Sequence, residues 1–283
     1  VPVNLFETTG RASEAEVVAD PSGTVYVFWA YGAPGNEASG SSQAIYHVSQ
    51  EGGFWSQPVD ILTSPGARVA RMHSVVADGA GYLHIAWSGS NAIFYSRAYA
   101  PQATLARAWT SPAMLVSGVN ALEPDIATDG RGNLYVVWTQ ARAGLMLARS
   151  DDGGDTWTEP QAAYVADSDT ELARWGRLAV DDAGRLHLAL THAVREPGVS
   201  QQRDDPNFLY YLRSHDRGQT WTEPFQITAS PNFGEVNVVT FGRDVVHVAW
   251  NGRADRTGRY HRWSADGGQR WSEIDEIVSP DSP

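Results

Sequence analysis

A short motif, S-x-D-x-G-x-T-W, occurs three times in the C-terminal half of the chain. The copies span 150–157, 214–221 and 264–271, and the third has Arg270 in place of the threonine. The shared positions are Ser150, Asp152, Gly154, Trp157, Ser214, Asp216, Gly218, Trp221, Ser264, Asp266, Gly268 and Trp271. A degenerate copy runs through 49–55, and 96–109 occupies the equivalent place with an insertion. Repetition at this spacing predicts an architecture built from one recurring structural repeat.

A second pattern recurs out of phase with the first and sets the length of the repeat. An apolar run ends at an anchor residue, and a Trp or Leu follows nine residues later. The anchors are Asp20, Asp78, Asp129, Asp181 and Phe241, at steps of 58, 51, 52 and 60 residues. These steps are too long for a helical hairpin repeat and are close to the length of a four-stranded propeller blade.

Each repeat divides into four strands. The first ends at the anchor, and a Gly-containing turn leads into a second strand that alternates strictly, with Leu83, Ile85 and Trp87 on one face. The third strand precedes the motif, and the fourth begins near a proline after the motif Trp. The sequence predicts an all-β fold, a β-propeller of five four-stranded antiparallel blades, with 1–283 as one domain. Because 2–6 resembles a fourth strand, it is expected to be an extra edge or closing strand, or else the alternative is a six-bladed propeller with one blade incomplete or missing.

The repeated polar residues are predicted to stabilise the fold. In the motif, Ser and Asp can form hydrogen bonds within the turn, Gly can adopt a positive φ, and Trp supplies apolar surface. His84, His187 and His247 share one position of the second strand, where the other repeats have Tyr26 and Tyr135. Blade packing explains these histidines better than metal binding or catalysis.

Composition excludes several classes of function. The net charge is −12, which argues against a nucleic-acid partner, and all 21 cationic residues are arginine, which excludes a lysine Schiff base. Cysteine is absent, so no disulfide or thiolate metal site can form. No cofactor motif, metal site, signal peptide or membrane-spanning apolar run is found, so we expect no cofactor, no metal and no membrane insertion. The start at Val1 fits a processed or excised product.

Variable loops locate a candidate site at one end of the blades. The connection from the second to the third strand covers 30–44 in the first repeat and 191–208 in the fourth. In the second repeat the same connection has only a few residues, which follow Trp87. Specificity usually resides in loops that vary on a repeated scaffold. The first strand of a blade lies nearest the propeller axis, so its early residues are expected to form a ring. Four residues before the anchors lie Glu16, Ser74, Asp125, Arg177 and Asn237, and six residues before them lie Glu14, Met72, Glu123, Trp175 and Glu235.

Carboxylates, arginines and aromatic rings in this ring suit a sugar, which needs hydrogen bonds to its hydroxyls and a stacking surface for its apolar face. The alternative is that these are only solvated loop residues. The candidate ligand-binding residues are Glu16, Arg71, His73, Glu123, Asp125, Arg174, Trp175, Arg177, Asn237 and Arg253.

The S-x-D-x-G-x-T-W motif resembles the Asp box, or BNR repeat, of sialidase-like β-propellers. The resemblance covers essentially the whole chain, but the motif is specific for a fold rather than for an activity. It implies a glycan or glycoconjugate as partner and a secreted or cell-surface location.

The resemblance also provides a catalytic hypothesis. Sialidases use an arginine triad, a Tyr nucleophile assisted by a Glu, and an Asp acid/base. The resemblance implies Tyr260 as the nucleophile, Glu235 as its helper and Asp125 as the acid/base. The triad would consist of Arg177 together with Arg71, Arg174 or Arg253. Sialidases also carry an arginine in an Arg-Ile-Pro sequence near the N-terminus, and this chain has no such sequence. Among the five positions four residues before the anchors, only Arg177 is an arginine. We therefore expect a carbohydrate-binding or accessory propeller. An exo-sialidase or other retaining glycoside hydrolase is the alternative, and a protein-interaction propeller is a further one.

Overall fold

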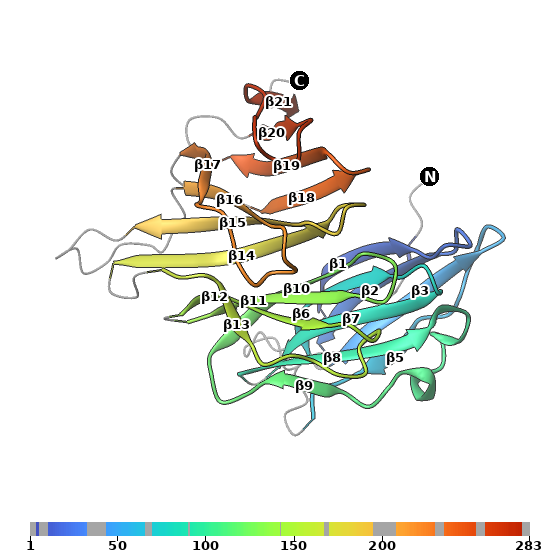
Figure 1. Cartoon of the computed structure of the whole chain (residues 1–283). Coiled ribbons are helices and arrows are strands. Elements are labelled where there is room, and N and C mark those ends of the chain that lie inside the picture. Colours follow the sequence, from blue (N-terminus) through green and yellow to red (C-terminus); the bar gives the residue numbers. More distant parts are fainter. Residues whose placement is uncertain are drawn as a thin grey trace. The chain divides into compact units, whose positions relative to one another are not determined.

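The computed structural model describes residues 4–5, 11–32, 44–65, 70–89, 91–141, 143–166, 170–194, 208–229, 235–252 and 258–278. These residues form five antiparallel sheets (Figure 1), and the only helical elements among them are the 3-10 turns η2 (Ala100–Gln102) and η3 (Ala106–Ala108). Within the same ranges, no helix has the length and apolar character needed to cross a membrane.

The strands follow the predicted order of four per repeat. Sheet 1 contains β1 (Arg11–Ala19), β2 (Val25–Gly32), β3 (Ala44–Glu51) and β5 (Val59–Leu62), with the short β4 (Phe54–Trp55) also paired to β3. Sheet 2 contains β6 (Arg71–Ala77), β7 (Tyr82–Gly89), β8 (Ala92–Tyr99) and β9 (Ala113–Val116). Sheet 3 contains β10 (Ala121–Thr128), β11 (Leu134–Gln140), β12 (Gly144–Ser150) and β13 (Gln161–Tyr164). Sheet 4 contains β14 (Glu171–Val180), β15 (Leu186–Val194), β16 (Phe208–Ser214) and β17 (Phe225–Ala229). Sheet 5 contains β18 (Val236–Phe241), β19 (Val245–Gly252), β20 (Gly258–Ser264) and β21 (Asp275–Val278).

This arrangement confirms the predicted fold class, a five-bladed β-propeller of four-stranded blades. Of the segment 2–6 that suggested a further strand, only residues 4 and 5 are described, and they form no strand. The chain divides into two compact units. Unit 1 comprises 1–136 and 149–158, and unit 2 comprises 137–148 and 159–283. Each unit has an apolar core between neighbouring sheets, with Phe28 and Trp87 in unit 1 and Leu209 and Trp250 in unit 2.

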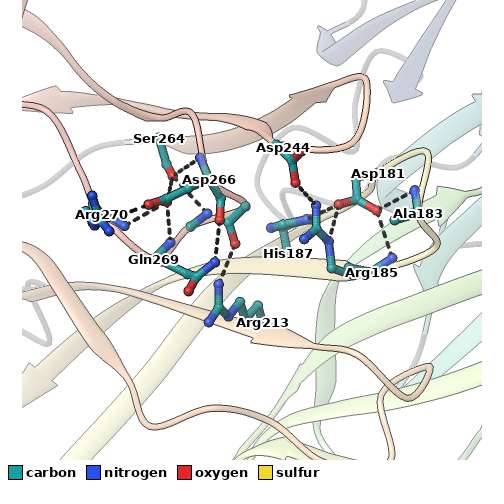
Figure 2. A network of polar contacts seen from close by, with 12 residues as sticks. Asp181, Ala183, Arg185, His187, Arg213, Asp244, Ser264, Asp266, Gln269 and Arg270 are labelled. Atoms are coloured by element: carbon teal, nitrogen blue, oxygen red, sulfur yellow. Dashed lines mark hydrogen bonds and ion pairs between the residues drawn. The ribbon is translucent and has the colours of Figure 1, made fainter.

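In the first four repeats the anchor Asp closes the turn after the first strand. The Oδ1 atom of Asp181 accepts hydrogen bonds from the backbone amides of Ala183 and Arg185, both at 2.9 Å (Figure 2). Asp20, Asp78 and Asp129 accept the same two bonds in their own turns. The side chain thus replaces backbone partners in a tight turn, which explains why Asp recurs there.

The second-strand histidines connect these turns to the third strands. His187 is fully buried, with Nδ1 2.6 Å from the Tyr211 hydroxyl and Nε2 3.2 Å from Oδ2 of Asp181. His84 contacts Tyr95 and Asp78 in the same way, at 2.8 and 3.2 Å. These contacts agree with the packing role inferred from the repeat position.

The S-x-D-x-G-x-T-W motif is closed by its own hydrogen bonds. Ser150 donates its hydroxyl to Oδ1 of Asp152 at 2.7 Å and accepts the amide of Gly154 at 2.8 Å, while Asp152 accepts the amide of Thr156 at 2.9 Å. The copy from Ser214 repeats this pattern. The copy from Ser264 does so as well (Figure 2). Hydrogen bonds from Thr220 are the main reason why the pKa of Asp216 falls to about 2. Such a carboxylate is already occupied within its turn.

The motif also packs against a neighbouring sheet within each unit. In unit 1 the Trp157 ring meets Tyr95 edge-on at 4.8 Å, and in unit 2 Trp271 meets Tyr211 at 4.8 Å. Arg213 donates to the Gly267 carbonyl at 2.8 Å (Figure 2), and Arg97 donates to the Gly153 carbonyl. The motif is therefore a structural connection between consecutive sheets.

We expect Trp157→Ala to destabilise the protein without changing glycan binding. The ring is half-buried, so the expected loss is about 2 to 3 kcal/mol, below the range for a fully buried Trp. Urea unfolding and glycan binding should be measured on the same variant, with the exposed Trp263→Ala as control. Wild-type unfolding combined with lost binding would contradict the structural role of the motif.

The degenerate copy at 49–55 is a tight hairpin rather than a worn motif. The amide of Ser49 donates to the Ser56 hydroxyl, just as the amide of Arg149 donates to Thr158, so Ser49 does not take the place of Ser150. Gln50 pairs with Trp55 and Glu51 with Phe54. Gly52 and Gly53 form the turn with φ of +56° and +86°, as a two-residue hairpin loop requires.

Candidate functional site

The first strands of four sheets contain the same backbone irregularity. Glu14, Met72, Glu123 and Trp175 have φ of 58°, 50°, 57° and 49°. The strand register shifts at this place between β1 and β2, between β6 and β7, and between β14 and β15, which marks a β-bulge. A non-glycine residue in this conformation costs about 1 to 3 kcal/mol, and such strain concentrates at functional sites. Four of the five positions that lie six residues before the anchors have this positive φ. The fifth, Glu235, precedes β18 and does not have it.

The predicted ring residues divide between the two units. Glu16, Arg71, His73, Glu123 and Asp125 belong to unit 1, and Arg174, Trp175, Arg177 and Asn237 belong to unit 2. Arg253 lies outside the described residues.

In unit 1 the carboxylates connect neighbouring first strands. Glu14 accepts the amide of Met72, and Glu16 accepts the amide of Val75 at 2.9 Å. On the next strand, the Ser74 hydroxyl donates to Oδ1 of the buried Asp125 at 2.9 Å. These acidic side chains hold the bulged backbones of β1, β6 and β10 together, so part of the predicted set has a structural role.

His73 is the buried histidine of this group. Its side chain is 4% exposed, and neither ring nitrogen has a hydrogen-bond partner of acceptable geometry among the described residues. Burial lowers its pKa to about 4, against a smaller opposing effect of the Phe28 backbone. His73 is therefore neutral at neutral pH. The neighbouring Arg71 is half-buried, and its carbonyl accepts the Ser88 hydroxyl at 2.9 Å.

In unit 2 the bulge of β14 brings two of the predicted residues together. The Arg174 guanidinium lies 4.7 Å from the Trp175 ring centre, a cation–π contact. The Thr191 hydroxyl donates to the Arg174 carbonyl at 3.0 Å. Arg177 pairs with Ala189 after the bulge, and Asn237 pairs with Ala249 on the neighbouring sheet.

A cluster of aromatic and polar side chains lies beside this bulge and was not predicted. We call it the tyrosine–histidine cluster, and it consists of Tyr164, Glu171, His192, Phe208 and Tyr210. The Tyr164 hydroxyl lies 3.2 Å from Nδ1 of His192, and Nε2 of His192 lies 3.8 Å from Oε1 of Glu171. The rings of His192 and Tyr210 are 5.2 Å apart, and Phe208 stacks on Tyr210 at 5.8 Å.

Strand register explains how the cluster forms. Ala173 pairs with His192, and His192 pairs with Phe208, so these three residues share one face of sheet 4. Glu171 and Tyr210 lie two residues from Ala173 and Phe208 and therefore share that face. Tyr164 comes from β13, the last strand of sheet 3. By the same alternation Arg174 lies on the opposite face of sheet 4.

Burial sets the protonation states in the cluster. Desolvation, reinforced by the nearby Glu171 carboxylate, raises the pKa of Tyr164 to about 12 and also raises the pKa of Tyr210. Burial lowers the pKa of His192, although Glu171 opposes this shift. At neutral pH the cluster thus presents neutral hydroxyl and imidazole groups, one carboxylate and aromatic rings. This set can form directional hydrogen bonds beside a stacking surface.

The cluster lies where the sequence predicted variable loops. His192 and Phe208 are on either side of the long connection of the fourth repeat, most of which lies outside the described residues. A sequence signal was present in the aromatic-rich run from Phe208 to Tyr211, directly after the long connection of the fourth repeat. Tyr164 carried no such signal, because its neighbours in space come from the next repeat.

In sheet 5 the two residues of the proposed catalytic pair lie on, or directly before, strands that are not neighbours. Tyr260 on β20 stacks on Trp250 at 6.0 Å, and Glu235 lies just before β18, with β19 between the two strands. Asp125 is engaged by Ser74 in unit 1. In the part of the chain that the structure describes, no group of three or more His, Asp or Glu side chains could hold a metal ion.

The family model of the BNR repeat-like domain matches residues 6–192. The chain belongs to the BNR repeat-like domain family. This BNR repeat-like chain has no match among the curated proteins.

Solved structures with a similar fold include a protein of unknown function from Dyadobacter fermentans DSM 18053, at 15% identity and a TM-score of 0.70, covering 96% of this chain and 84% of that one. A Hadza microbial sialidase matches at 20% identity and a TM-score of 0.55, covering 84% of this chain and 55% of that one. An α-L-arabinanase from Penicillium chrysogenum, complexed with arabinobiose, matches at 12% identity and a TM-score of 0.64, covering 95% and 82%. At these identities the similarity shows the sialidase-like propeller fold of this BNR repeat-like chain, and not its activity.

Proposed function

We propose that the protein binds a carbohydrate at the tyrosine–histidine cluster, as a binding or accessory propeller. The observation that carries this proposal is the contact of Tyr164, His192 and Tyr210 at the loop end of sheets 3 and 4. The Tyr210 and Phe208 rings offer a surface on which the apolar face of a sugar can stack. The Tyr164 hydroxyl and the Glu171 carboxylate can donate to and accept from sugar hydroxyls.

Two of the similar solved structures support sugar as the ligand class. They are by name a sialidase and an arabinanase, the latter with arabinobiose bound. A glycan-binding protein of this kind is expected to act in a secreted or cell-surface location.

Binding is favoured over sialidase-type hydrolysis by the chemistry of the tyrosines. A tyrosine nucleophile needs help to lose its proton, whereas burial raises the pKa of Tyr164 to about 12. Tyr260 stacks on Trp250 and is separated from Glu235 by a strand. Glycoside hydrolysis therefore stands as the second candidate, to be tested with a fluorogenic sialoside.

We expect Tyr210→Ala to reduce glycan affinity about five- to tenfold, since it removes a stacking ring worth about 1 to 1.5 kcal/mol. Tyr164→Phe, which removes only a hydroxyl, should reduce affinity about three- to tenfold. A glycan array identifies the ligand, and calorimetry then measures each variant. Tyr82→Ala, a partly exposed tyrosine of unit 1, is the matched control.

Three outcomes would overturn the proposal. If Tyr210→Ala binds like the wild type while Arg177→Ala does not, the sugar binds at the first-strand positions instead of the cluster. Turnover of the sialoside that is lost in Tyr260→Phe would establish the hydrolase. No binding on the array and no turnover would favour the protein-interaction propeller.

A further inference from the structure

A pocket of about 460 Å³ lies in unit 1, at the end of sheet 1 that carries its tight turns. Its walls come from the turn after β1, from the hairpin of β3 and β4, and from the inserted segment that follows β8. Side chains that define it are Ser22, Thr24, Glu51, Phe54, Trp55 and Thr104. Its volume falls within the usual range for small-molecule sites of about 300 to 1,000 Å³.

The pocket is lined by segments of the two repeats that depart from the pattern. Between sheets 2 and 3 the equivalent space is filled, since Trp157 packs on Tyr95 and Gly154 lies directly against that ring. Next to sheet 1, the motif of the first repeat is replaced by the short hairpin with Gly52 and Gly53. The second repeat has the insertion with η2 and η3 in place of a motif loop.

The insertion that forms one wall is firmly anchored. Trp109 is buried and meets Phe28 edge-on at 6.1 Å. The Ala103 carbonyl accepts the Trp109 indole N–H at 3.0 Å and lies 2.7 Å from Nε2 of His47. These bonds hold the segment from Ala100 to Thr104 beside the hairpin, so the pocket has preformed walls and a ligand need not order them.

The lining favours a neutral, hydroxyl-rich molecule. Among the described residues, the lining contains the carboxylates of Asp20 and Glu51 and no Arg or His, which disfavours an anionic sugar. Asp20 is occupied by Ser22, Thr24 and Tyr26, which leaves Glu51 as the exposed acceptor. At the rim the Phe54 ring is 82% exposed, the highest value among the large apolar side chains described. An exposed ring on a tight hairpin beside several hydroxyl groups is the arrangement that a sugar requires.

We infer that this pocket is a second carbohydrate site, which takes a neutral sugar and is separate from the tyrosine–histidine cluster. Phe54 stacks on the apolar face of the sugar, and Glu51 accepts hydrogen bonds from its hydroxyls. The hydroxyls of Ser22, Thr24 and Thr104 supply further polar contacts. This inference does not depend on the proposed function, because the two sites share no residue.

The test uses the Tyr210→Ala protein, so that the first site does not contribute to the signal. Maltose, cellobiose, lactose and arabinobiose are titrated separately and followed by calorimetry and saturation-transfer NMR. We expect at least one of them to bind, with a loss of about tenfold or more in Phe54→Ala and about threefold in Glu51→Gln. The control is Phe241→Ala, which removes a 63% exposed phenylalanine of unit 2, and thermal melting checks that each variant is folded.

Several results would overturn the inference. One is that none of the four disaccharides binds to the Tyr210→Ala protein. Another is that a bound disaccharide is unaffected by both Phe54→Ala and Glu51→Gln. Tighter binding of sialyllactose or glucosamine than of any neutral disaccharide would show that the ligand class is wrong. If the proposed site at the tyrosine–histidine cluster is wrong, Tyr210→Ala in the otherwise wild-type protein will leave glycan binding unchanged.

Discussion

Gly154→Ala is expected to destabilise the protein by about 4 kcal/mol, a large effect for one methyl group. The residue has φ of +95°, and an added Cβ would lie 2.0 Å from the Tyr95 hydroxyl and 2.4 Å from Cζ of the same ring. The unfavourable φ alone costs about 1 to 2 kcal/mol. To make room, Tyr95 must move away from His84 and Trp157, which it contacts at 2.8 and 4.8 Å.

Gly23→Ala is the matched control for this prediction. Gly23 has φ of +86°, and nothing lies within 4 Å of its added Cβ, so only the backbone cost of about 1 to 2 kcal/mol applies. Urea unfolding of both variants separates strain from steric conflict. Equal losses of unfolding free energy in the two variants would show that the contact between Gly154 and Tyr95 is not tight. Gly268→Ala in unit 2 should behave like Gly154→Ala, since its Cβ would lie 2.0 Å from the Tyr211 hydroxyl.

Acidification from pH 6.5 to 4 is expected to remove on the order of 3 kcal/mol of unfolding free energy for each of two buried histidines. Burial lowers the pKa of His73 and of His187 to about 4. For His187 the Asp181 carboxylate opposes this shift, while Arg185 and Arg213 reinforce it. Between pH 6.5 and 4 the unfolded chain binds protons that the folded protein does not, so stability falls as the pH falls. Above pH 6.5 this contribution is constant.

The measurement is the slope of unfolding free energy against pH, from urea titrations between pH 7 and 4. His73→Leu should reduce this slope by up to about 1.4 kcal/mol per pH unit, the value for one proton. An unaltered slope in His73→Leu would mean that His73 binds protons equally in the folded and unfolded states, which contradicts the prediction. Asp181, whose pKa is lowered by Arg185 and His187 despite its burial, loses its contribution only at still lower pH.

The tyrosine–histidine cluster and the pocket show different limits of sequence interpretation. In the cluster, His192 was visible as a residue of a variable loop, but Tyr164 lies 28 residues away in the preceding repeat. In the pocket, the irregular repeats at 49–55 and 96–109 were visible in the sequence, but their effect depends on how the two segments face each other. Counting back from the anchors picked out the first-strand positions as a ring, but not as bulges. Their positive φ cannot be assigned from residue type, because Glu14, Met72, Glu123 and Trp175 have no common side chain.

The sequence by itself determined the five repeats, their four strands and the closure of the turns by Asp and Ser. These features depend on alternation and on hydrogen bonds between residues no more than four positions apart, such as Asp152 with Thr156. Only the tertiary structure decided which polar residues meet. Glu16 accepts the amide of Val75, and His192 meets Tyr164, because neighbouring sheets pack face to face and bring together residues from different repeats. Packing of that kind depends on side-chain volume and register over the whole sheet, and no local pattern encodes it.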